Sequence, residues 1–250
     1  MTRWKAFGIH IGISAAIGAA AAALIALVWY PPPLLQATGS DRFLMILIGV
    51  DVVVGPLLTL LVFKPGKKSL RFDLTVIALL QVAALCYGLW TAVSSRPVFL
   101  VEAVDRITLV RANLIQPDDL ALARANGRGF DQLSWIGPVL VGSRMPDDPT
   151  ERRELTLKAL EGAKPLEERP QFYVPFDEEA SALLARAKPL PPLFPRSPTA
   201  MREIEAIAEA SGESIDALVY VPLETGKHDI AVILSPTSGR PVGMVAVDPW

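Results

Sequence analysis

Residues 43–63 read FLMILIGVDVVVGPLLTLLVF, a run of 21 residues in which Asp51 carries the single formal charge. About 20 apolar residues in a helix cover the roughly 30 Å of a bilayer's hydrocarbon core. Two further runs flank this one, because residues 8–30 hold no charged side chain and only Gln81 is strongly polar in residues 74–93. Three such runs, separated by short polar segments, predict three transmembrane helices near 8–30, 43–63 and 74–93.

The first run has an alternative interpretation as a cleaved secretory signal, because it follows Arg3 and Lys5 and contains an alanine tract. The apolar region of a signal is about 7–15 residues long, whereas this run continues to Trp29 and Tyr30. Aromatic residues of this kind are typical of the membrane–water interface. We therefore expect the first run to remain as a spanning helix.

The distribution of charge predicts the orientation. Residues 1–95 hold three acidic and seven basic side chains, whereas residues 96–250 hold 23 acidic and 17 basic ones. Short loops rich in Lys and Arg stay on the cytoplasmic side, and only Arg42 and Arg96 fall on the opposite side. The bases that predict a cytoplasmic N-terminus and an anchoring loop are Arg3, Lys5, Lys64, Lys67, Lys68 and Arg71.

An odd number of spans then places residues 96–250 outside the cytoplasm, which in a bacterial inner membrane is the periplasm. This segment has the length of one domain. It is acidic and so lacks the basic field that binding to nucleic acid requires. We expect it to be a separate α+β domain, with residues 1–95 forming the transmembrane domain.

Short runs rich in β-branched residues predict an antiparallel sheet in this domain. Residues 98–104 and 107–111 read as a hairpin, and residues 217–223, 230–234 and 242–247 read as a meander. Helix starts are indicated at Pro117, at Asp148 and at Ser197, with Gly212 ending the last helix. The proline-rich residues 188–198 are expected to form an extended surface segment.

Two polar residues in the spans are candidates for function. Asp51 lies at a depth where an acid costs on the order of 2.5–3.5 kcal/mol to insert, and such residues normally face a helical bundle with a partner. Gln81 falls about one helical turn from the same depth. The pair either joins the spans to one another or serves a partner-binding or proton-linked role. Gly55 and Pro56, one turn beyond Asp51, predict a helix kink.

Small residues recur every four positions along the first span. One stripe begins with Gly8 and Gly12, and a second contains Ser14 and Gly18. This spacing lets helices approach closely in a membrane. It is explained either by packing within the three-helix unit or by docking of another protein's transmembrane helix.

Signatures of catalysis and metal binding are missing from the sequence. His10 and His228 stand alone and are expected to be structural, and Cys86 is the only cysteine. We find no zinc or calcium spacing, no nucleophile elbow and no phosphate loop. We therefore expect no metal, no cofactor and no enzymatic activity.

Several blocks of sequence, taken in order, resemble the type IV pilin accessory protein family (TfpX/TfpZ type). The blocks are FGIHIGIS (7–14), WYPPPL (29–34), GVDVVVGPLLTLLVFKPGKKSLRFDL (49–74), IALLQVAALCYGLW (77–90) and RPVFLVEAVDR (96–106). The resemblance implies an inner-membrane accessory to the major pilin that affects pilus assembly. It brings no catalytic residue.

The chain does not resemble a pilin itself. Type IV pilins resemble one another in a processed glycine followed by an apolar run with glutamate at its fifth position, and no glutamate follows Gly8 or Gly12 in this apolar run. Our hypothesis is that the first span's small residues, with Asp51, hold the pilin helix, while residues 96–250 contact its globular domain. Components of the assembly platform are further candidate partners.

Two rival functions remain open from the sequence. One is a membrane sensor whose exported domain binds a ligand, although its predicted cytoplasmic segments are too short for a signalling domain. The other is a small oligomeric transporter or membrane enzyme built around Asp51, which would have only Gln81 beside it.

Overall fold

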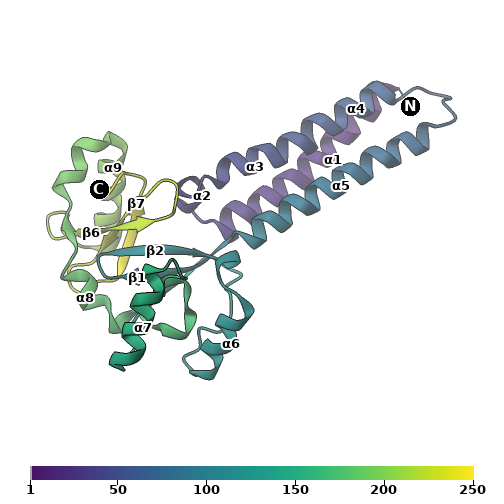
Figure 1. Cartoon of the computed structure of the whole chain (residues 1–250). Coiled ribbons are helices and arrows are strands. Elements are labelled where there is room, and N and C mark those ends of the chain that lie inside the picture. Colours follow the sequence, from purple (N-terminus) through teal and green to yellow (C-terminus); the bar gives the residue numbers. More distant parts are fainter. Residues whose placement is uncertain (1) are drawn as a thin grey trace. The chain divides into compact units, whose positions relative to one another are not determined.

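A computed structural model describes residues 2–250, with the backbone alone described for residues 194–196 and 198. The chain forms two compact units. The helical unit contains the residues up to Leu35 and Gly39–Ser95, and the α+β unit contains Gln36–Thr38 and Arg96–Trp250. The elements of both are labelled in Figure 1.

Three long helices make up the helical unit and confirm the three predicted spans. The first comprises α1 (Arg3–Ala23) and a π-helical stretch, Leu24–Trp29. The second comprises α3 (Ser40–Gly49), a π-helical stretch at Val50–Val54 and α4 (Gly55–Val62), and the third is α5 (Leu70–Ser94). They run for 27, 23 and 25 residues, each long enough to cross a bilayer. A short helix, α2 (Leu34–Ala37), lies in the first connector.

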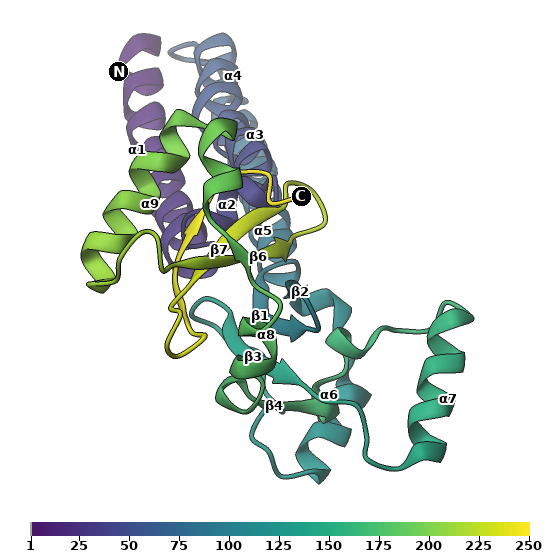
Figure 2. The same ribbon diagram turned by 90° about the vertical axis from the view of Figure 1, so that its left-hand side faces the viewer.

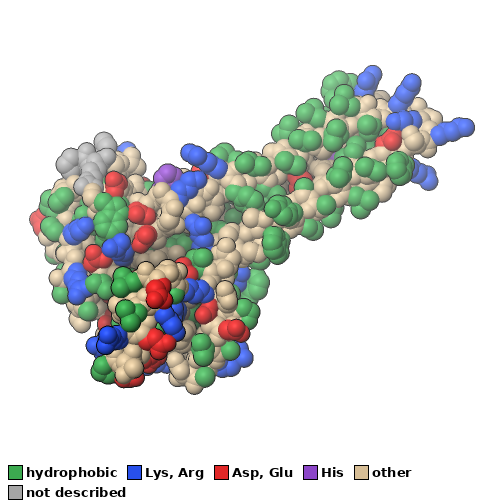
Figure 3. Space-filling view, viewed as in Figure 1, with side chains coloured by type: hydrophobic (Ala, Val, Ile, Leu, Met, Phe, Trp, Pro, Cys, Tyr) green, Lys and Arg blue, Asp and Glu red, His purple; other side chains and the backbone are tan. Residues whose placement is uncertain are grey.

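Close packing joins the three helices. Tyr30 is buried and donates a hydrogen bond from its hydroxyl to the carbonyl oxygen of Ala92, 3.2 Å away. A β-carbon on Gly88 would lie 2.3 Å from Cδ1 of Leu47, so this contact needs a glycine. Figure 3 shows apolar side chains along the outer surface of the helices, with Lys and Arg gathered at the end that carries the N-terminus. Such a surface suits a hydrocarbon surrounding.

One eight-stranded sheet organises the α+β unit, in the order β4-β3-β1-β2-β6-β7-β8, with β5 pairing to β6. All seven residues of the central strand β1 are buried. The strands are β1 (Pro97–Ala103), β2 (Arg106–Arg111), β3 (Val139–Ser143), β4 (Tyr173–Pro175), β5 (Lys188–Pro189), β6 (Val219–Glu224), β7 (Ile230–Leu234) and β8 (Pro241–Val245).

The sheet is mixed, whereas the sequence predicted an antiparallel one. The hairpin β1–β2 and the meander β6–β7–β8 are antiparallel, as expected. However, β3 runs parallel to β1, and β6 runs parallel to β2. Parallel neighbours need long crossover connections, and the segments after β2 and before β6 provide them. Neither pairing leaves a pattern in the local sequence.

Helices of the α+β unit begin where the sequence signals place them. They are α6 (Pro117–Ala125), α7 (Pro149–Leu160), α8 (Ala180–Leu184) and α9 (Pro198–Ser211). The Asp148 carboxylate accepts a hydrogen bond from the Thr150 main-chain N–H at 3.1 Å, which caps α7. Gly212 ends α9 with a left-handed φ of 71°. The short helix α8 directly follows Glu178 and Glu179, an acidic pair of the kind favoured at helix starts.

The proline-rich segment, residues 188–198, is not the extended surface segment that was expected. After the two residues of β5 it forms a 3₁₀ turn over Pro191–Arg196. Leu190 and Leu193 are fully buried and pack with Ile204 of α9 in a hydrophobic core. The apolar residues between the prolines therefore decide the conformation.

Candidate functional site

A π-helical turn in the second helix leaves the main-chain carbonyl of Asp51 without a donor from its own helix. In the π-helical stretch the Gly55 N–H donates to Val50, five residues back. The same pattern would give Asp51 its donor from residue 56, which is proline and has no N–H. Gln81 of α5 provides the missing hydrogen bond from Nε2, at 3.0 Å from the Asp51 carbonyl oxygen. The kink predicted at Gly55 and Pro56 coincides with this π turn but remains a prediction.

His10 of α1 extends this network to all three helices. Its Nε2 lies 2.8 Å from Oε1 of Gln81, and its Nδ1 lies 2.6 Å from Oγ1 of Thr59 in α4. Because an amide oxygen can only accept, Nε2 of His10 carries a proton. Gln81 Nε2 also approaches Oγ of Ser14, at 3.5 Å. Ser14, Asp51 and Gln81 were candidates from the sequence, whereas His10 was expected to be an isolated structural residue and Thr59 was not singled out.

A groove of about 180 Å³ opens between α1 and α5, with Asp51 of the second helix among its walls. The Asp51 side chain is 5% exposed. Its Oδ1 atom is buried and finds no hydrogen-bond donor among residues 2–250. A buried polar atom without a partner is rare in folded proteins. The groove is lined by His10, Ile13, Ser14, Ile17, Asp51, Ala78, Gln81, Val82 and Leu85.

Apolar side chains form the mouth of the groove. Ile13, Ile17 and Val82 are exposed on the outer surface of the helical unit. In a chain that spans a bilayer, such a mouth faces lipid or the helix of another membrane protein. The groove therefore combines apolar walls with one hydrogen-bond acceptor, Oδ1 of Asp51. Such a groove suits a hydrogen bond from an apolar partner and not the binding of a hydrated solute.

The structure separates the two small-residue stripes of α1. Ser14 and Gly18 are buried, and a β-carbon on Gly18 would contact Val52 at 3.4 Å, so this stripe packs within the unit. Gly8 and Gly12 are exposed, and a β-carbon on either would meet no described atom within 4 Å. One stripe is therefore occupied by the chain's own helices, and the other is open.

The basic residues predicted as a cytoplasmic anchor lie between α4 and α5 or in the first turn of α5. All are exposed, and they comprise Lys64, Lys67, Lys68 and Arg71. Lys67 forms an ion pair with Asp73, with Nζ and Oδ2 2.6 Å apart. Their placement fits a polar boundary next to the apolar surface.

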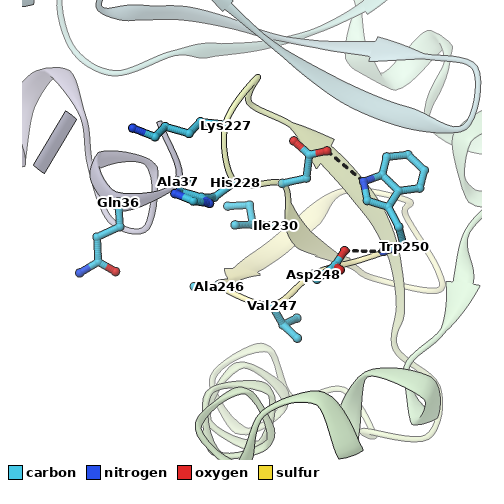
Figure 4. A pocket seen from close by; sticks show the side chains of 10 residues that line it. Gln36, Ala37, Lys227, His228, Ile230, Ala246, Val247, Asp248 and Trp250 are labelled. Atoms are coloured by element: carbon cyan, nitrogen blue, oxygen red, sulfur yellow. Dashed lines mark hydrogen bonds between the residues drawn. The ribbon is translucent and has the colours of Figure 1, made fainter. Parts of the chain in front are cut away.

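The α+β unit holds a larger hollow of about 490 Å³ beside the first connector (Figure 4). The carbonyl oxygen of Ala37 accepts hydrogen bonds from Oγ1 of Thr225 at 3.0 Å and from the main-chain N–H of His228 at 3.1 Å. Residues 36–38 are thus folded into this unit. No group of three metal-ligating side chains occurs in the described part of the chain.

A family described as "Fimbrial assembly protein FimB" matches residues 1–39. A fimbrial assembly protein of serogroups C1 and C2 from Dichelobacter nodosus is 35% identical over 121 residues, covering 48% of this chain and 92% of that protein. The chain belongs to the fimbrial assembly protein family. The fimbrial assembly protein of serogroup I from the same organism is 29% identical over 226 residues, covering 89% of this chain and 86% of that protein.

Membership of the fimbrial assembly protein family confirms the resemblance that the sequence motifs indicated. The similarity to the longer relatives extends over most of the chain and so includes both units. Within the helical unit, the family match covers α1 with His10 and both small-residue stripes. No solved structure matches the chain.

Proposed function

We propose that this protein acts in pilus assembly as an inner-membrane accessory that binds the major type IV pilin and modulates its assembly. The observation that carries the proposal is the groove between α1 and α5, in which Oδ1 of Asp51 lacks a donor. The relatives are named fimbrial assembly proteins, which favours a role in pilus assembly.

The occupant that suits this groove is a transmembrane helix with a hydrogen-bond donor. Water is scarce at this depth, so an unsatisfied acceptor costs free energy that a partner's donor recovers. Type IV pilins carry a glutamate at the fifth position of their apolar helix, and its carboxyl group donates a hydrogen bond when protonated. Before assembly the pilin helix lies in the same bilayer. We infer that it enters the groove and donates to Asp51.

The open stripe of α1 offers a second surface for a membrane partner. Gly8 and Gly12 lie on a different side of α1 from His10 and Ser14, which face the groove. Small residues let a neighbouring helix approach closely. We propose this stripe as a secondary contact, for a second pilin helix or for a component of the assembly platform.

The proposed orientation places residues 96–250 in the periplasm. The hydrogen bonds from Thr225 and His228 to Ala37 support it, because the first connector and residues 96–250 can form them only from the same side of a membrane. Lys64, Lys67 and Lys68 then lie on the other side, where basic loops are retained. Cysteines introduced at Lys68 and at Thr237 in a Cys86→Ala background test this. A membrane-impermeant thiol reagent added to spheroplasts should label only Thr237→Cys.

The α+β unit offers α7 as a contact for the pilin's globular domain. None of this helix's described side chains is buried, and Leu157 and Leu160 are exposed. Figure 2 shows α7 standing apart from the strands. An isolated helix of this length is marginal in water, so a partner that covers it would stabilise it.

Photo-crosslinking in cells tests the groove. A photo-reactive amino acid replaces Val82, which lines the groove and is 58% exposed, or Leu80, which is 62% exposed and does not line it. We expect crosslinks to pilin from position 82 and few or none from position 80. Equal crosslinking from both positions, or none from position 82 in piliated cells, would contradict the groove as the binding site. A pull-down of the membrane complex, probed for pilin and for platform proteins, identifies the partner independently.

A further inference from the structure

A turn in the α+β unit is fixed to the residue that follows the third span. Arg96 lies between the end of α5 at Ser94 and the start of β1 at Pro97. Its Nε donates to the carbonyl oxygen of Ser134 at 3.0 Å, and its guanidinium carbon lies 4.1 Å from the ring centre of Trp135. Arg96 is buried under this contact. The turn is therefore held at the point where the chain leaves the membrane.

The turn leaves two large apolar side chains exposed. The main-chain N–H of Ile136 donates to Oγ of Ser134 at 3.2 Å, and Gly137 has a left-handed φ of 59°. Trp135 is 62% exposed and Ile136 is 82% exposed. A single exposed apolar residue needs no explanation. Two adjacent ones, in a turn bound to Arg96, call for an explanation.

We propose that the turn at Trp135 and Ile136 is a membrane-surface anchor that inserts among the lipid head groups. The short distance along the chain supports this, because the two residue steps from Ser94 to Arg96 span at most about 7 Å. The head-group layer adds about 5–7 Å beyond the hydrocarbon on each side. Tyr87 and Trp90 in the last turns of α5 are exposed aromatic residues of the kind found at that boundary. The anchor thus gives the α+β unit an attachment to the bilayer besides the chain itself.

The attraction is apolar and not electrostatic. Residues 96–250 are acidic overall, so an anionic membrane would repel this unit. An indole and a branched aliphatic side chain gain free energy by leaving water for the interface whatever the charge of the lipid. The inference does not depend on pilin binding, because it concerns the protein and its own bilayer.

Fluorescence in lipid nanodiscs tests the anchor on the full chain. Cys86→Ala removes the only cysteine, and Ile136→Cys then carries an environment-sensitive nitrobenzoxadiazole label. Leu160→Cys in the same background is the matched control, since Leu160 on α7 is 80% exposed. Phosphatidylcholine discs contain lipids with a nitroxide at the head group, at the top of the acyl chain or near its end.

We expect the label at position 136 to emit at shorter wavelength than at 160, and to be quenched most strongly by nitroxides at the head group and the top of the chain. Arg96→Ala should weaken that quenching by releasing the turn. Equal emission and quenching at positions 136 and 160 would overturn the proposal. Quenching that appears only after anionic lipid is added would overturn it as well, because the attraction would then be electrostatic.

Discussion

Gly55 lies so close to Gln81 that a β-carbon at residue 55 would be 2.0 Å from Nε2 of that side chain. The contact exists because Gln81 must reach the Asp51 carbonyl oxygen that Pro56 leaves without a donor. Gly55 is thus required by the hydrogen bond next to it. The π turn, the proline and the glycine form one local arrangement.

Gly55→Ala should displace the Gln81 side chain and lose its hydrogen bonds to Asp51 and His10. Hydrogen bonds within membranes contribute about 0.6–1.7 kcal/mol each. We therefore expect the free energy of unfolding to fall by about 1–2 kcal/mol. Thermal unfolding of the full chain in detergent measures it. Gly12→Ala is the matched control, because its new methyl group meets nothing within 4 Å.

A double-mutant cycle with Gln81→Ala makes this prediction specific. If Gly55→Ala acts through Gln81, the double variant should be about as stable as either single variant. Additive losses would show that the alanine perturbs the helix in some other way.

Substitutions at Asp51 distinguish an acceptor from a proton carrier. Asn keeps an oxygen acceptor in the groove, and Leu removes it. We expect Asp51→Asn to retain most crosslinking of pilin from position 82 and Asp51→Leu to lose it, with both variants normally inserted. Loss of piliation with Asp51→Asn, while pilin is still bound, would favour the rival function in which Asp51 transfers protons.

Sequence alone was sufficient for the spans because a bilayer sets a fixed length for an apolar helix. It was sufficient for the caps of α7 and α9 because those hydrogen bonds are local. It missed β3 and β4, since β3 pairs with a distant parallel strand and β4 is only three residues long. The burial of Leu190 and Leu193 depends on α9, which follows in the sequence.

The candidate site was predictable only in part. Asp51 and Gln81 were recognisable because polar side chains in a span are rare. The position of Thr59, four residues beyond Gly55 and eight beyond Asp51, placed it on the same helix face. However, the groove depends on how α1 and α5 are rotated about their axes, and no pattern of residues along one helix determines that.

The turn between β1 and β2 contains a strained residue. Val104 has a φ of 60°, which is unusual for a β-branched side chain, and it is exposed. Val104→Gly should raise the stability of the α+β unit by about 0.5–1 kcal/mol, because relief of strain outweighs the added chain entropy. Val139→Gly in β3, where the backbone is extended, should instead lower it. Thermal unfolding of the full-length variants distinguishes the two, and similar losses from both would contradict strain at Val104.

The buried acid Glu102 makes stability depend on pH. Burial raises the pKa of its carboxyl group above the usual value, and the nearby charge of Glu179 raises it further. The folded state then binds more protons than the unfolded state, so this contribution to stability falls as pH rises from about 4.5 through the folded-state pKa. Glu102→Gln should therefore be stabilising at neutral pH, with the gain shrinking toward pH 4. Glu154→Gln is a control with the opposite sign, because Lys158 lowers the pKa of exposed Glu154.

Helix α7 should report binding of the pilin's globular domain through amide hydrogen exchange. Its cap at Asp148 and the ion pair between Glu154 and Lys158 are local interactions, and none of its described side chains is buried. We expect its amides to exchange quickly in the free protein and to slow when purified pilin is added, because a helix of this length needs a packed face to persist in water. Strand β1, whose seven residues are all buried, is the internal control. Replacing Leu157 and Leu160 by serine should abolish the slowing while leaving α9 unchanged. If the slowing persists in that variant, pilin contacts the unit elsewhere and α7 is stabilised only indirectly.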